Sequence, residues 1–183
     1  MHRSVTAVCA LSLSLAVVLL GCSNNGGEAQ VITPASPTLA PALAMQSIDG
    51  KRISIADFRG KVVVVDFWAS WCPPCREGLP HIQNLSSNAD FRARGLVVLA
   101  VNEQENAADI RRFIDQSHYT FTVLSDPDGS AARAYSAISL PTTVVIGRDG
   151  TIRLIVTGCT PATADRLDQE IARLLQRSAD QNS

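Results

Sequence analysis

Apolar and polar positions along this chain follow the two periods of a mixed α/β protein. Residues 62–68 (Val-Val-Val-Val-Asp-Phe-Trp) form an almost unbroken apolar run. Four consecutive β-branched residues closed by aromatic residues are typical of a strand buried on both faces, as in a parallel sheet. Residues 96–101 and 121–124 repeat this pattern on a shorter scale. The pattern therefore predicts a sheet core built from these runs.

Between and after these runs, the apolar residues change to helical spacing. A helix is expected directly after residue 75, with a buried face formed by Leu79, Ile82 and Leu85. Asn106 is a favoured N-cap for a second helix that ends near residue 117, and a short helix is expected over 130–136. Thr160 caps the final helix, whose apolar positions recur at Leu167, Ile171, Leu174 and Leu175.

Two hairpins complete the predicted elements. Residues 43–55 and 142–156 each contain an Asp-Gly pair between two short alternating stretches, which is a strong turn signal. The segment between Asn102 and Pro141 leaves room for an additional helix and strand. The predicted fold class is therefore α/β: a central mixed sheet flanked by helices, with an N-terminal β-hairpin and a central αβ insertion.

The N-terminal residues read as a targeting segment. Arg3 precedes an apolar run over residues 5–20, too short for a comfortable membrane span, which is the plan of a signal peptide. The run ends in Leu-Leu-Gly-Cys-Ser and resembles a bacterial lipobox, so Cys22 is the expected lipidation site after removal of residues 1–21. An ordinary secretory signal with an incidental cysteine is the alternative. Ser23 resembles the outer-membrane sorting preference of such lipoproteins.

The rest of the chain divides by composition. Residues 23–41 are rich in Ser, Asn, Gly, Ala and Pro, so we expect a flexible linker there. Together with the expected lipidation site it makes up the segment 22–41. Residues 42–178 form the expected folded domain, and residues 179–183 a polar tail. The formal net charge of −1 and the absence of a Lys/Arg cluster argue against a nucleic-acid partner. Five cysteines are too few for a disulfide scaffold.

Two of these cysteines carry the candidate chemistry. Cys72 and Cys75 are separated by two residues and lie between a buried strand and a helix start. Backbone N–H groups and the helix dipole favour a thiolate on Cys72, and Cys75 is then placed to resolve a mixed disulfide. The alternative is a zinc half-site, which needs two further ligands. Cys159, His81 and His118 are the candidates, and they form no second pair.

At these residues the chain resembles a known family. Residues 65–76 (Val-Asp-Phe-Trp-Ala-Ser-Trp-Cys-Pro-Pro-Cys-Arg) are similar to the active-site segment of the thioredoxin superfamily, and Pro80 and the Leu140-Pro141-Thr142 segment are further matches. The resemblance covers about residues 43–177. It is nearest to the membrane-tethered TlpA/ResA-like thiol-disulfide oxidoreductases and implies a thioredoxin-like fold without a bound cofactor beyond the Cys72–Cys75 disulfide.

The resemblance also assigns roles to residues around the cysteines. Asp66 matches the buried acid of thioredoxins that assists proton transfer at the second cysteine, although the lysine partner of that acid would fall near Ala100 and is absent. A strand-end Asp bonded to backbone or water is the alternative. Pro141 matches the cis-proline that faces the cysteine pair, where Leu140 would pair with a substrate segment. An ordinary trans proline in a turn is the alternative. Trp71 would shield the disulfide, whereas Trp68 belongs to the core.

The direction of electron transfer is predicted from Pro73 and Pro74. Neither residue has an N–H, so two donors to the Cys72 thiolate are missing, and the reduced state is stabilised only moderately. This favours a reductant of protein disulfides. By resemblance, its substrates are apocytochrome c cysteines or other envelope proteins, a membrane electron donor of the DsbD/CcdA type re-reduces it, and it works as a monomer. The alternatives are an oxidant or isomerase on the same fold and a metal-carrying lipoprotein.

Three further residues are expected to be structural. Cys159 is interpreted as a small buried residue, with a third redox thiol as the alternative. His81 is expected to be exposed. Gly78 is unusual inside a helix, where it costs about 1 kcal/mol relative to Ala, and close packing is the expected reason for it.

Overall fold

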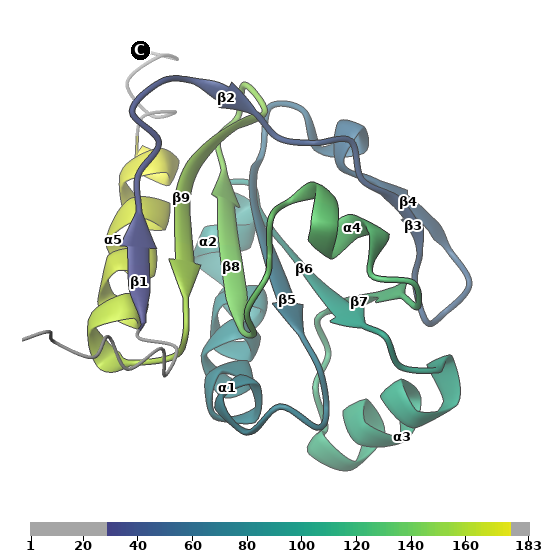
Figure 1. Ribbon diagram of the computed structural model, residues 1–183. Helices are drawn as coiled ribbons and strands as arrows, with labels where there is room; N and C mark the ends of the chain where they lie inside the picture. The colour runs from purple at the N-terminus through teal and green to yellow at the C-terminus, as the bar shows by residue number, and fades with distance from the viewer. Residues whose placement is uncertain (1–28, 177–183) are drawn as a thin grey trace, which may run out of the picture.

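Strand β5, Val62–Trp68, lies in the middle of the main sheet, and all of its residues are buried. The structure is a computed structural model that describes residues 29–176. A two-stranded sheet (β3, β4) and helices surround the main sheet (Figure 1). The remaining elements are β1 (Gln30–Ile32), β2 (Thr38–Leu39), β3 (Ala44–Gln46), β4 (Arg52–Ser54), the 3₁₀ helix η1 (Ile55–Phe58), α1 (Pro73–Ser87), α2 (Ala89–Ala93), β6 (Leu96–Glu103), α3 (Ala107–Ser117), β7 (Thr122–Asp126), α4 (Ser130–Ala134), β8 (Thr142–Ile146), β9 (Thr151–Thr157) and α5 (Pro161–Gln176).

The main sheet is mixed, as predicted. Its order is β1-β9-β8-β5-β6-β7, and β2 also pairs with β9. Strand β5 runs parallel to β6 and antiparallel to β8, so the predicted buried run sits between neighbours on both sides. The Asp-Gly turns at both predicted hairpins join β3 to β4 and β8 to β9 in antiparallel pairs. The α/β fold class with its N-terminal hairpin is therefore confirmed.

Alternate residues of β5 point to two separate cores. Val62, Val64 and Trp68 pack with the buried faces of α1, α3 and α5. Val63, Val65 and Phe67 pack on the opposite face with α4 and the β3–β4 hairpin. This alternation explains why the run is apolar except at Asp66, because both faces of the strand are covered and a polar residue on either face is costly.

The central insertion supplies α3, β7 and α4 between β6 and β8. Asn106 caps α3 as predicted, since its Oδ1 accepts the N–H groups of Ala108 and Asp109. Helix α4 is held at its start by the buried carboxylate of Asp126, which accepts N–H groups of the first turn. The insertion extends the sheet by one parallel strand beside β6.

Part of the segment predicted to be a flexible linker is ordered. Residues 30–32 and 38–39 form β1 and β2, which pair antiparallel with the outer edge of β9. Backbone hydrogen bonds to an otherwise open strand edge order this segment, although Val31 and Leu39 stay exposed. Such pairing needs no hydrophobic periodicity, so the composition of the segment gave no sign of it. The predicted signal peptide, Cys22 and the polar tail lie outside the described residues.

Candidate active site

Cys72 and Cys75 lie at the start of α1, shortly after the end of β5. They are joined by a disulfide bond, and their Cα atoms are 5.3 Å apart. Cys72 is the N-cap of α1, and Pro73 and Pro74 occupy the first helical positions, where a missing N–H costs nothing. The Cys75 N–H donates to Sγ of Cys72 at 3.2 Å. Cys72 keeps 4% of its surface exposed and Cys75 keeps 1%. The pair therefore sits at a helix N-terminus, as the sequence predicts.

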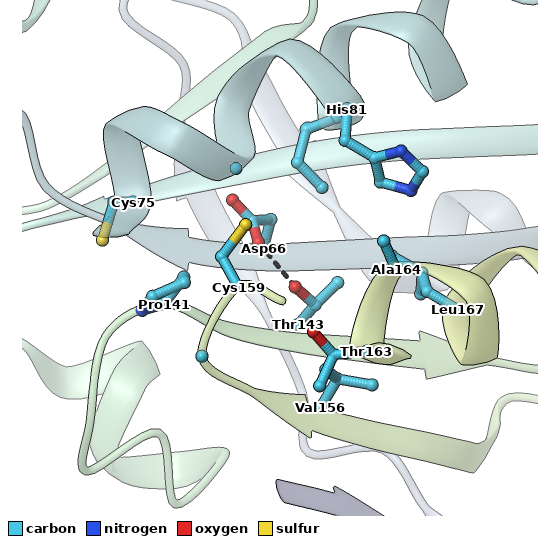
Figure 2. Close-up of a pocket in the computed structure, with 13 residues that line it drawn as sticks. Asp66, Cys75, His81, Pro141, Thr143, Val156, Cys159, Thr163, Ala164 and Leu167 are labelled. Atoms are coloured by element: carbon cyan, nitrogen blue, oxygen red, sulfur yellow. Dashed lines mark hydrogen bonds between the residues drawn. The ribbon is translucent and has the colours of Figure 1, made fainter. Parts of the chain in front are cut away.

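Asp66 lies on β5 and lines the same pocket as Cys75. Its carboxyl is almost fully buried and accepts a hydrogen bond from Oγ1 of Thr143 at 2.7 Å (Figure 2). Its partner in the parallel β5–β6 register is Ala100, so the neighbouring position on that strand carries no cation. Burial raises the pKa of Asp66 to about 7, and the Thr143 hydrogen bond opposes that rise. The carboxyl can therefore exchange a proton near neutral pH.

Thr143 is the partner of Asp66 that sequence reasoning missed. The sequence predicts backbone or water as the alternative partner of this acid, whereas the structure supplies a side chain from β8. The register of the antiparallel β5–β8 pair places the two residues opposite one another. The only sign of Thr143 in the sequence is that it directly follows the Pro141-Thr142 pair. The β5–β8 register is what shows that it lies opposite Asp66.

A small pocket joins these groups. Asp66, Cys75, Pro141 and Cys159 contribute to its lining, and α5 closes one side with Thr163 (Figure 2). The Leu140–Pro141 peptide bond is cis, which confirms the prediction made for it. The Pro141 carbonyl accepts the N–H of Gly158 at 2.9 Å, so the proline loop is joined to the end of β9.

Cys159 is a free, half-buried thiol in this pocket. Burial, and then the negative charges of Glu77 and Asp66, raise the pKa of the Cys159 thiol. Its sulfur would lie 3.2 Å from a Cβ atom placed on Gly78. The close-packing interpretation of Gly78 is therefore correct, and the packing partner is Cys159.

The prediction for His81 is wrong. Its side chain is only 30% exposed, and Nε2 lies 3.1 Å from Oδ1 of Asp168 on α5. The helical spacing that puts Ile82 in the core turns the neighbouring His81 toward α5, which the sequence of α1 alone does not show. His81 also contributes to the pocket lining, at the end away from the disulfide (Figure 2).

The two tryptophans before the disulfide differ in burial. Trp68 is completely buried, as predicted, and packs against the ring of Phe113 with centroids 5.4 Å apart. Trp71 directly precedes Cys72 and exposes 65% of its surface. Its ring is thus available to a protein that approaches the disulfide.

Among residues 29–176, no group of three or more His, Cys, Asp or Glu side chains is arranged to hold a metal ion. Within the same residues, no helix has the length and apolar character needed to cross a bilayer.

A thioredoxin-like sheet with a Cys-Pro-Pro-Cys disulfide at a helix N-terminus, facing a cis-proline, defines a thiol-disulfide oxidoreductase. The chain belongs to the AhpC/TSA family, whose sequence profile matches residues 38–155. It is similar to the thiol-disulfide oxidoreductase ResA of Oceanobacillus iheyensis, with 31% identity over 86% of this chain and 81% of that protein.

Two further similarities agree with this family. ResA of Bacillus subtilis is 34% identical over 65% of this chain, and the match spans 65% of that protein. A Chlorobium tepidum structure that bears the name thiol:disulfide interchange protein DsbE superposes with a TM-score of 0.71. It has 36% identity and covers 76% of this chain and 96% of the other.

Proposed function

We propose that this thiol-disulfide oxidoreductase reduces protein disulfides outside the cytoplasm while held to a bacterial membrane by a lipid on Cys22. The direction of the reaction is inferred from one observation. In the first turn of α1, Pro73 and Pro74 have no N–H, and the Cys75 N–H donates to Sγ of Cys72. A thiolate with few donors is only moderately stabilised, so the dithiol form gives up its electrons readily.

The reaction starts from the reduced pair. The Cys72 thiolate attacks one sulfur of the substrate disulfide, and the other substrate sulfur leaves as a thiolate and takes up a proton. Cys75 loses its proton, through water, to Asp66 and attacks Sγ of Cys72. The mixed disulfide breaks, and the Cys72–Cys75 disulfide forms. The second substrate sulfur leaves as a thiolate and takes up a proton from solvent, so the substrate is released as a dithiol. Two electrons have then passed to the substrate.

The substrate is expected to bind across the surface around the disulfide. Exposed Trp71 and the ring of Pro73 lie on the helix side, and Leu140 and Pro141 lie on the loop before β8. An extended substrate segment that pairs with the backbone at Leu140 would place its disulfide over Cys72. Pro74 completes this contact surface. Recognition of backbone rather than side chains suits an enzyme with several protein substrates.

The proposed substrates are apocytochrome c haem-site cysteines or other envelope proteins. A membrane electron donor of the DsbD/CcdA type would return the enzyme to its dithiol form. The Leu-Leu-Gly-Cys-Ser sequence supports a lipoprotein on the extracytoplasmic face, and Ser23 supports the outer membrane. No metal or organic cofactor is required, because the two electrons reside in the cysteine pair.

Trapping tests this function directly. In Cys75→Ala the mixed disulfide on Cys72 cannot be resolved, so substrates should accumulate as covalent adducts in the native envelope. The matched Cys72→Ala variant should trap none. Equilibration of the wild-type protein with glutathione should give a potential below about −200 mV, on the reducing side of disulfide isomerase. A value near −120 mV would assign the protein as an oxidant, and stoichiometric copper or zinc after purification would favour a metal carrier.

A further inference from the structure

Glu105 holds the loop that leads to the redox disulfide. It lies between β6 and α3, and its Oε2 accepts the backbone N–H of Ser70 at 2.6 Å. Its Oε1 accepts the Ser70 hydroxyl. Both oxygens of one carboxylate therefore bind a residue two positions before Cys72. Hydrogen bonds to an ionised carboxylate are about twice as strong as neutral ones.

The orientation of Glu105 is fixed from the core. Nδ2 of Asn102 donates to Oε2 of Glu105 at 2.7 Å, and Asn102 is completely buried near the end of β6. In the parallel register, Asn102 pairs with Trp68, the last residue of β5. The carboxylate thus links the C-terminal ends of two adjacent core strands. Hydrogen bonds to protein groups fix its orientation.

Ser70 is coupled to the geometry of Cys72. The Cys72 N–H donates to the Ala69 carbonyl at 3.2 Å, which closes a tight turn around Ser70. The same turn sets Cys72 as N-cap, with its sulfur 3.2 Å from the Cys75 nitrogen. A displacement of Ser70 would therefore move the Cys72 sulfur away from the helix N-terminus that stabilises its thiolate.

We propose that Glu105 is a positioning residue for the thiol-disulfide reaction. It acts through Ser70, by holding residues 69–71 so that the Cys72 sulfur stays at the start of α1. The inference rests on the proposed role of Cys72 as the attacking thiol. Glu105 does not stand out in the sequence, because its neighbour Asn106 accounts for the local pattern as a helix cap.

Three roles for Glu105 give different outcomes. A positioning role predicts that Glu105→Ala raises the apparent pKa of Cys72, because the thiolate loses its donors. A simple charge effect predicts a lower pKa, because a negative charge near the thiolate is removed. A structural role alone predicts lower stability with no change in the pKa of Cys72.

The experiment compares Glu105→Ala, Glu105→Gln and the control Asp109→Ala in the reduced full-length protein. Asp109 follows Glu105 closely, is also acidic, and pairs with Arg112 on α3. The pH dependence of Cys72 alkylation by iodoacetamide gives the thiol pKa, and insulin reduction gives the rate. Urea unfolding reports stability separately. Glu105→Gln keeps one acceptor oxygen and removes the charge.

We expect Glu105→Ala to raise the pKa of Cys72 and to slow alkylation and insulin reduction near neutral pH by about threefold or more. Glu105→Gln should fall between Ala and wild type, and Asp109→Ala should match wild type. An unchanged or lowered pKa in Glu105→Ala overturns the proposal, whatever happens to stability. If Glu105→Ala does not fold, Ser70→Ala removes the hydroxyl bond alone and should give a smaller shift in the same direction.

The wild-type measurement separates this inference from the function on which it rests. Alkylation of Cys75 before Cys72 in the wild-type protein would overturn the proposed function. Alkylation of Cys72 first, with an unchanged pKa in the Glu105→Ala and Ser70→Ala variants, would overturn only the role of Glu105.

Discussion

Oγ1 of Thr143 donates a hydrogen bond of 2.7 Å to Oδ1 of Asp66 across the β5–β8 pair. Two opposing effects meet at this carboxyl: burial disfavours its charged form, and the Thr143 hydroxyl favours it. The resulting pKa of about 7 leaves Asp66 able to accept and release a proton under physiological conditions. The proposed role of Asp66, which is to exchange a proton with Cys75 in both directions, needs that balance.

The first prediction concerns stability and pH. The pKa of Asp66 rises from 3.8 to about 7 on folding, so between these values the folded state binds more protons than the unfolded state. The free energy of unfolding should therefore fall as pH rises from about 4 to about 7, by an amount on the order of 3 kcal/mol from Asp66. Urea unfolding at pH 4 to 8 measures it, and Asp66→Asn should lose this part of the slope.

Glu103 is expected to contribute to the same dependence of stability on pH. Burial and the neighbouring Asp126 raise the pKa of Glu103 to about 7 as well, so it contributes in the same pH range. Asp66→Asn should therefore flatten the profile only in part. Thr143→Val should move the midpoint of the Asp66 contribution to higher pH, whereas Thr122→Val, at the exposed first residue of β7, should not. A profile that Asp66→Asn leaves unchanged would contradict the titration assigned to Asp66.

The second prediction tests the packing between Gly78 and Cys159. A Cβ atom on Gly78 would lie 3.2 Å from the Cys159 sulfur, so Gly78→Ala should gain helix propensity but lose through crowding. In a Cys159→Ala background the crowding by sulfur is absent, and Gly78→Ala should then raise the free energy of unfolding by up to about 1 kcal/mol. A double-mutant cycle in urea measures the coupling. Strict additivity would show that the two side chains do not limit one another.

The third prediction concerns the residues between the cysteines. Pro74→His should raise the redox potential and lower the pKa of Cys72, because a cation beside the thiolate stabilises the reduced form. Pro74→Asn restores an N–H without a charge and is the matched control, with a smaller expected change. Glutathione equilibration and alkylation kinetics measure both quantities. If Pro74→His leaves the potential unchanged, the explanation of the reducing direction from missing donors fails.

The fourth prediction concerns membrane attachment. Cys22→Ser removes the thiol that a lipid would modify, so the protein should move from the detergent-requiring membrane fraction to the aqueous fraction. Cys9→Ser is the control, because residue 9 lies in the segment expected to be removed. Fractionation and immunoblotting measure the change. Retention of the Cys22→Ser protein in the membrane would contradict the lipid anchor.

Local patterns in the sequence determined much of this protein. The buried strand, the capped helices, the hairpins and the Cys72–Cys75 pair each depend on residues that are close together in the chain, so periodicity and turn chemistry are enough to predict them. The family resemblance supplied the position of cis-Pro141. These elements also fixed the order of helices and strands, and with it the α/β fold class.

Only the tertiary structure decided which distant side chains meet. The β5–β8 register joins Thr143 to Asp66, packing of α5 turns His81 toward Asp168, and the parallel β5–β6 pair brings Glu105 to Ser70. The pairing of β1 and β2 with β9 likewise joins residues that are far apart in the sequence. Strand register and helix packing are set by the sum of many weak contacts over the whole domain. The hydrogen-bond partner of a single polar side chain is therefore determined only when all the elements have packed together.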